Sequence, residues 1–224
     1  MTNAVLCQIG ICTPVSPPPE EMTREDVRHW RSATGVASEG EKGGAILQGY
    51  EGRLADNLTS GLYDGIVEAM TNTVHHAYVG QSGEQLKKHI GRRWWALSQE
   101  REGNLTVAIC DLGIGIPRSL PRSATFSRPV VQTAWKALGL DKSDASAIRV
   151  ALELGKTSTG QKGRGRGLSE IVEAANLSAG GRVLISSNKG VFVSVDGKSY
   201  ARNASHAIRG TLILWTVEMT RDEA

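Results

Sequence analysis

An apolar run that stops at an aspartate and two glycines is the feature that most constrains the fold. Residues 104–111 read NLTVAICD, and their alternating pattern, rich in Val and Ile, predicts a β-strand that ends at Asp111. Gly113 and Gly115 follow, and glycine allows a backbone to turn tightly and approach a flat ligand. A carboxylate at this position can accept a hydrogen bond from an exocyclic amine such as that of adenine. The alternative is an ordinary strand-ending turn, to which Asp, Gly and Pro are well suited.

A dinucleotide-binding G-x-G-x-x-G pattern does not fit the same segment. Arg118 stands where the third glycine would be, and Pro117 interrupts the segment. The segment therefore does not indicate a Rossmann-type site.

Residues 58–78 carry apolar side chains at helical spacing, which predicts a helix. Its apolar stripe consists of Leu62, Ile66, Ala69, Met70, Thr73 and Ala77. Glu68 and Asn72 are four residues apart and therefore share another face. Gly61, Gly65 and His75 fall near that face, and we expect the two small glycines to leave room for a ligand. A carboxylate can act as a general base and an amide oxygen can bind Mg²⁺, although a solvated polar face is the simpler alternative.

The segment Gly160–Leu168, GQKGRGRGL, opens a further predicted helix at 168–177. Free backbone N–H groups at a glycine-rich helix start bind anions, and the helix dipole adds to this attraction. Lys162, Arg164 and Arg166 supply positive charge for phosphates. The segment is not a P-loop, because its lysine precedes the glycines. The alternative is a flexible basic surface loop.

Taken in this order, the motifs resemble the nucleotide-binding boxes of the GHKL (Bergerat-fold) ATPase superfamily, which includes histidine-kinase-like ATPase domains. Glu68 and Asn72 resemble the first box. The other boxes are matched by Asp111, Gly113 and Gly115, by Gly163, Gly165, Gly167 and Leu168, and by Gly210 and Thr211. The resemblance covers roughly residues 55–218. Glu-Ala-x-x-Asn followed by His-x-x-Tyr is most similar to anti-sigma-factor kinases and related bacterial ATP-binding proteins.

The resemblance implies a role for each matched residue. Glu68 would be the general base, Asn72 the Mg²⁺ ligand and Asp111 the residue that binds the adenine amine. The 163–167 loop would close over the phosphates, with Lys162 and Arg164 near them. Thr211 would support the adenine base through a water molecule. Residues 117–163 would form a lid.

The implied activity is that of an ATPase or protein kinase that binds ATP and Mg²⁺. The γ-phosphate of ATP would pass to water or to a protein partner, and that partner would be a phosphoacceptor or a regulated protein. The alternative is a non-catalytic protein-interaction module whose partner binding is switched by ATP.

The order of elements predicts the fold class. A second helix is expected at 83–100, and two shorter ones at 130–138 and 144–154. The chain ends in strands at 182–187, 191–195 and 211–218, the first two joined by a turn at 188–190. This order favours an α+β protein, a two-layer α/β sandwich whose mainly antiparallel mixed sheet has helices on one face. The resemblance implies the Bergerat fold.

Two units are expected. Residues 1–50 are interpreted as an arm or linker with a short helix at 23–33, a strand at Ala4–Cys12, and a Gly- and Ser-rich loop at 34–46. Residues 51–224 form the ATP-binding domain. The arm offers a contact for a homodimer.

Composition limits the partners. A net charge of +3 is too small to indicate nucleic acid, although Trp94 and Trp95 adjoin a basic cluster at 87–93 and could stack on bases or lie in the core. Three cysteines fit neither a zinc pattern nor a disulfide framework, which favours the cytoplasm. No apolar run approaches the roughly 20 residues that span a membrane, and the N-terminus does not resemble a signal peptide. We therefore expect neither a membrane-spanning helix nor a signal peptide.

Overall fold

One antiparallel sheet organises the computed structural model, which describes residues 30–50, 52–80, 84–85, 87–88, 91–122, 127–157, 167–178 and 180–219. The strand order is β1-β2-β3-β7-β4-β5-β6, and every described pairing is antiparallel. The strands are β1 (Trp30–Gly35), β2 (Trp94–Arg101), β3 (Asn104–Asp111), β4 (Arg182–Ser187), β5 (Gly190–Val195), β6 (Lys198–Asn203) and β7 (Thr211–Glu218). The predicted α+β class is confirmed, but the described strands do not form a mixed sheet.

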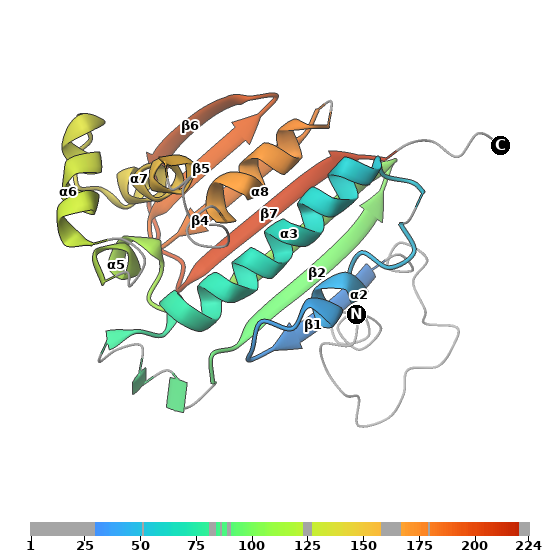
Figure 1. The fold of residues 1–224 in the computed structure, drawn as a ribbon, viewed down its shortest axis with the longest axis horizontal. Coiled ribbons are helices and arrows are strands. Elements are labelled where there is room, and N and C mark those ends of the chain that lie inside the picture. The colour runs from blue at the N-terminus through green and yellow to red at the C-terminus, as the bar shows by residue number, and fades with distance from the viewer. Residues whose placement is uncertain are drawn as a thin grey trace.

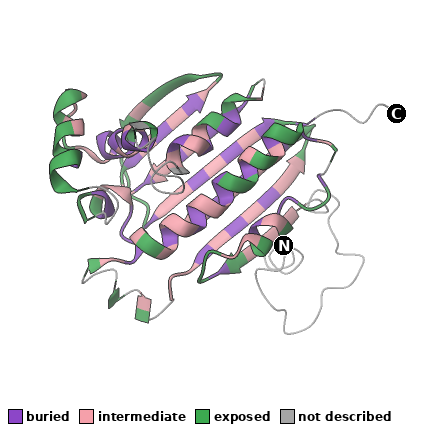
Figure 2. Ribbon diagram, in the orientation of Figure 1, coloured by how far each residue is buried: buried purple, intermediate pink, exposed green. Residues whose placement is uncertain are grey.

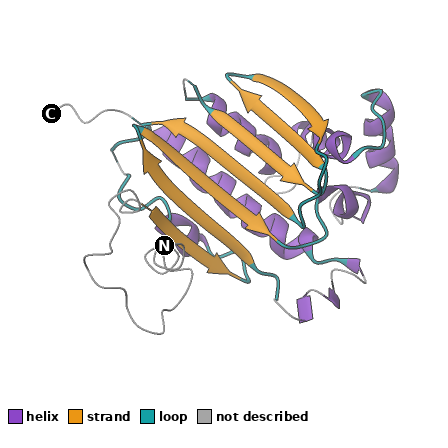
Figure 3. Cartoon of the chain, turned by 180° about the vertical axis from the view of Figure 1, so that it is seen from behind, coloured by secondary structure: helices purple, strands orange, loops and turns teal. Residues whose placement is uncertain are grey.

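Helices lie on one face of this sheet (Figure 1). The α-helices are α2 (Gly40–Ala45), α3 (Asp56–Asn72), α5 (Ile116–Ser119), α6 (Arg128–Ala137), α7 (Asp144–Thr157) and α8 (Gly167–Asn176). A π-helical turn, η3 (Thr73–Ala77), continues α3, and a 3-10 turn, η4 (Leu120–Arg122), follows α5. From behind, the sheet faces the viewer and the helices lie beyond it (Figure 3). None of the helices in the described parts of the chain is long and apolar enough to cross a bilayer.

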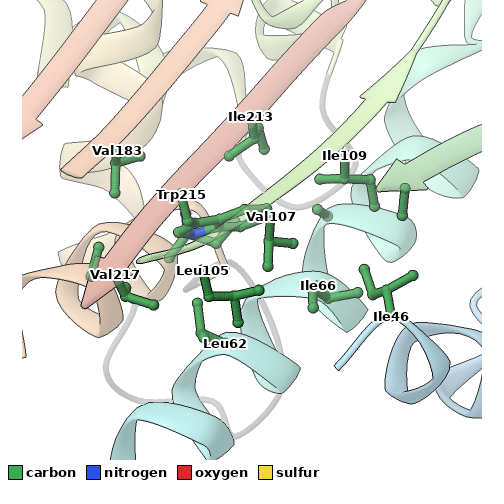
Figure 4. Close-up of a cluster of buried hydrophobic side chains, with 14 of the residues drawn as sticks. Ile46, Leu62, Ile66, Leu105, Val107, Ile109, Val183, Ile213, Trp215 and Val217 are labelled. Carbon is green, nitrogen blue, oxygen red and sulfur yellow. The ribbon is translucent and has the colours of Figure 1, made fainter. Parts of the chain in front are cut away.

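The main core lies between the sheet and α3. Alternate residues of a strand point to the same face, so Leu105, Val107 and Ile109 of β3 all point toward the helices and are buried. They pack around the fully buried Trp215 of β7 and against Ile66 of α3 (Figure 4). Figure 2 shows the same alternation of buried and partly exposed residues along the central strands.

Small residues bring α3 and α8 together. A Cβ atom on Gly61 would lie 2.8 Å from the Cβ of Ala174, and one on Gly65 would lie 3.1 Å from Cγ1 of Ile171. The two helices run antiparallel, since the earlier glycine of α3 meets the later residue of α8. The expectation that these glycines leave room for a ligand is therefore wrong, because α8 fills that space.

Two segments predicted as helix are strands. Residues 30–33 belong to β1 rather than to a helix at 23–33, whose earlier residues lie outside the described parts of the chain. The predicted helix at 83–100 is wrong from Trp94 onward, where β2 begins. Trp94, Ala96 and Ser98 alternate with less buried residues and pair with β1 and β3 on either side. Tertiary pairing decides the structure of this segment.

The predicted boundary at residue 50 also needs correction. Ile46, Leu47 and Tyr50 are buried in the main core, and the hydroxyl of Ser98 donates a hydrogen bond to the carbonyl of Ile46. Residues 30–50 are therefore part of the domain. The predicted strand at 4–12 lies outside the described residues.

Candidate functional site

The end of α3 is fixed against the segment that follows β3. The carbonyl oxygen of Ala77, the last residue of the π-helical turn, accepts a hydrogen bond of 2.7 Å from the N–H of Ile114. A Cβ atom on Gly113 would lie only 2.6 Å from the Cβ of Ala77. Contact within the protein therefore already requires glycine at position 113. Isolated π-helical turns occur often at functional sites.

Tyr78 also links the end of α3 to the segment that follows β3. Its hydroxyl donates to the carbonyl of Arg93 at 2.7 Å and accepts a hydrogen bond from the N–H of Leu112 at 3.3 Å. Burial raises the pKa of Tyr78 to about 12, so the phenol stays protonated and remains a donor. The start of β2, the end of α3 and the segment after β3 are thus held together.

Asp111 is the last residue of β3 and only 7% exposed. Its Oδ1 accepts a hydrogen bond of 2.7 Å from Gly113 N–H, and the N–H of Thr211 also donates to the carboxyl group. Burial raises its pKa to about 6, against the lowering effect of these two donors. A carboxylate has about four acceptor positions, so two remain for an external donor such as an amine.

Glu68 and Asn72 lie one turn apart on α3, as predicted, and both are partly exposed. The Asn72 side chain donates a hydrogen bond to the Glu68 carboxylate, which leaves the Asn72 amide oxygen available to a cation. Burial raises the pKa of Glu68, and the negative charge of Glu170 on α8 raises it further. A carboxylate with a raised pKa is a better general base near neutral pH.

The N-terminus of α8 lies at the same end of the helical layer as Glu68. This follows from the antiparallel packing of the two helices and from the effect of Glu170 on Glu68. α8 begins at Gly167, and Leu168 packs against the main core. The other predicted phosphate-binding residues, Lys162, Gly163, Arg164 and Gly165, lie outside the described residues.

A buried hydroxyl joins three segments at this edge of the sheet. Ser187, at the end of β4, is 0% exposed. Its Oγ accepts a hydrogen bond from Ile116 N–H at 2.8 Å, donates to the Gly210 carbonyl at 3.1 Å, and lies 3.0 Å from Oγ1 of Thr211. The predicted residue Thr211 is thereby tied to the segment after β3. Ser187 was missed, because one serine at the end of a strand carries no signal in a single sequence.

The β4–β5 turn closes this edge. Gly115 has a φ of +80°, and a Cβ atom on it would lie 2.9 Å from both Cγ of Asn188 and Oγ of Ser187. The side-chain oxygen of Asn188 is buried and has no hydrogen-bond partner among the described residues. Gly115, like Gly113, is explained by close packing of the protein.

The predicted lid of residues 117–163 includes a helix that is built into the core. Ile148 and Leu152 of α7 belong to the main core. Val150 and Leu154, on another face of α7, form a second cluster with Leu120 and Val131. α7 is therefore a fixed part of the helical layer, and the residues between α7 and α8 lie outside the described parts of the chain.

None of the predicted residues borders the polar hollow of about 250 Å³ at the start of α7. Its lining consists of Asp141, Ser143, Ala145, Ser146, Arg149, Ala201, Arg202 and Asn203. The described residues contain no cluster of three or more His, Cys, Asp or Glu that could hold a metal ion. Trp94, considered as a stacking residue for bases, is fully buried, and its indole donates to the Ala37 carbonyl.

Comparison with known proteins adds no relative: no family model matches the chain, and no curated protein matches it.

Proposed function

We propose that this chain is a GHKL-type domain that binds ATP with Mg²⁺ and passes the γ-phosphate to water or to a protein. The observation that supports this most is the meeting of three groups at one end of the sheet and its helices. These are the Glu68–Asn72 pair, the buried Asp111, and the N-terminus of α8.

The buried end of the site suits adenine. Asp111 keeps acceptor positions beyond those used by Gly113 and Thr211. Its pKa of about 6 leaves it mostly ionised at neutral pH, and an ionised carboxylate is the stronger acceptor for an exocyclic amine. An amine donor at this place would offset part of the cost of burying the charge.

The open end suits phosphate and Mg²⁺. Mg²⁺ in proteins is held by one or two side-chain oxygens, with water and phosphate oxygens as its other ligands. The Asn72 amide oxygen supplies one such ligand beside the α8 N-terminus, which attracts anions. The glycine- and arginine-rich residues 160–166 directly precede that helix in sequence.

Glu68 is assigned the proton transfer. It would take the proton of an attacking water or hydroxyl while that oxygen bonds to the γ-phosphorus and the bond to ADP breaks. Such chemistry depends mainly on positioning and on charge stabilisation. Asn72 orients the Glu68 carboxylate through its hydrogen bond.

Phosphate release from ATP tests this proposal. Glu68→Ala should lose turnover while nucleotide affinity remains, and Glu173→Ala, an exposed glutamate of α8, serves as the control. Full turnover in Glu68→Ala would contradict the role of the base. No turnover in the wild type, with ATP binding intact, would instead favour the ATP-switched interaction module. We also propose a cytoplasmic location, on the basis of the cysteine pattern, and a protein partner, on the basis of the family resemblance.

A further inference from the structure

The sheet face that points away from α3 and α8 carries a continuous row of apolar side chains. Strand register aligns Leu97 with Ala108, Ala108 with Leu214, Leu214 with Leu184, Leu184 with Val193, and Val193 with Tyr200. This apolar row crosses six strands, from β2 to β6. Its last member, Tyr200, is 58% exposed. No described helix lies over this face (Figure 3).

The next row toward the Asp111 end of the sheet widens the patch. It places the partly exposed Trp95, Cys110, Leu212 and Val191 on the same face, interrupted by Ser186 of β4 and ended by Arg202 of β6. The next row toward the opposite end of the sheet is mostly polar: it contains Gln99, Thr106, Thr216, Arg182 and Lys198, with Val195 as its one apolar member on these strands. An antiparallel sheet that faces water on one side normally alternates apolar and polar residues along each strand. Here the apolar row from Leu97 to Tyr200 departs from that rule, and a contiguous apolar patch on the surface is typical of an interaction site.

The chain carries one segment with the matching chemistry. Residues 4–12, AVLCQIGIC, are seven apolar residues with one Gln and one Gly, and they contain no charge. The apolar row is also uncharged. Residues 4–12 therefore match the patch in polarity.

The length of the intervening chain allows this contact. Residues 13–29 separate the segment from β1, and 17 extended residues reach roughly 55 Å. Six strands about 4.8 Å apart span roughly 24 Å. Every part of the patch is therefore within reach of residues 4–12 of the same chain.

We propose that residues 4–12 pack onto the apolar row of their own chain. A short tether raises the effective concentration of the segment to the millimolar range, which favours it over a second copy of the protein. This inference goes beyond nucleotide binding and does not depend on it.

The three cysteines of the chain provide the test. Cys7 and Cys12 lie in the segment, and Cys110 lies in the patch, paired in register with Trp95 and Leu212. Treatment of the full chain with a short thiol-to-thiol cross-linker should join Cys110 to Cys7 or Cys12 within one chain, as mapped by mass spectrometry. Cys110→Ser should abolish this product. Cross-links between chains would overturn the proposal in favour of a second copy, and no cross-link to Cys110 would overturn it outright.

Charged variants of the segment give an independent measurement in the full chain. The double variant Ile9→Asp, Ile11→Asp should lose most of the cross-link to Cys110 and increase the fluorescence of a hydrophobic dye several-fold. Gln8→Asp adds a charge at a polar position and is the matched control. Equal cross-linking in both variants would contradict the proposal. ATP affinity should be the same in both, so failure of the nucleotide proposal remains separate.

Discussion

Gly210 packs directly against Asp111. A Cβ atom on Gly210 would lie 2.7 Å from the carboxylate Oδ1 of Asp111 and would collide with its carbonyl oxygen. The φ of Gly210 is +78°, a conformation that other residues rarely adopt. The close approach of the start of β7 to the end of β3 therefore requires a glycine at position 210.

Gly210→Ala should destabilise the protein well beyond the backbone cost. Gly103 has a similar φ of +76° but open space around its Cβ position, so Gly103→Ala measures the backbone cost alone, about 1–2 kcal/mol. Gly210→Ala should cost about 1–3 kcal/mol more, because Asp111 must move. Urea unfolding of both variants checks this difference, and equal losses would show that the close packing contributes nothing.

Asp111 should make stability depend on pH. Its pKa rises from 3.8 to about 6 on folding, so the folded state holds more protons than the unfolded state between those values. Stability is therefore greatest below pH 4 for this group and falls as the pH rises through 6, by roughly 3 kcal/mol. Asp111→Asn removes this contribution.

Urea unfolding at several pH values compares the two proteins. The free energy of unfolding of the wild type, minus that of Asp111→Asn, should decrease as the pH rises from 4 to 7. A constant difference over this range would mean that folding does not raise the pKa of Asp111.

Much of the fold and part of the site can be predicted from this sequence. β3 and β7 have the predicted bounds, because β3 alternates and is rich in Val and Ile and β7 is a short apolar run of strand-favouring residues. β2 was missed because its residues follow a run rich in Lys and Arg and include several helix-forming residues. β6 was missed because it is an edge strand with mostly exposed residues and no apolar alternation. The role of Gly61 depends on the position of α8, which no local pattern reveals.

Ser187→Ala should loosen the edge of the sheet beside Asp111. The substitution leaves the N–H of Ile116 without its partner, which costs about 1–3 kcal/mol. Ser194→Ala is the matched control, because Ser194 is equally buried but its one hydrogen bond among the described residues is a long contact of 3.5 Å to Asn176. We expect Ser187→Ala to weaken ATP binding and Ser194→Ala to leave it unchanged. Equal affinities in the two variants would exclude a positioning role for Ser187.

Glu170 should tune the proton affinity of Glu68. Its negative charge contributes to the raised pKa of Glu68, so Glu170→Gln should lower that pKa. The acidic limb of the pH profile of ATP turnover should then shift to lower pH, because the base loses its proton earlier. Glu173→Gln, an exposed change on the same helix, should leave the profile in place. An unmoved acidic limb in Glu170→Gln would contradict the coupling of Glu170 to a base that controls turnover.

Calorimetric titration with a non-hydrolysable ATP analogue, with and without Mg²⁺, tests the proposed site most directly. The wild type should bind the analogue more tightly with Mg²⁺, Asn72→Ala should lose that dependence, and Asp111→Asn should lose most of the affinity. Absence of binding to the wild type, or unchanged binding by Asp111→Asn, would contradict the assignment of an ATP site to this end of the sheet.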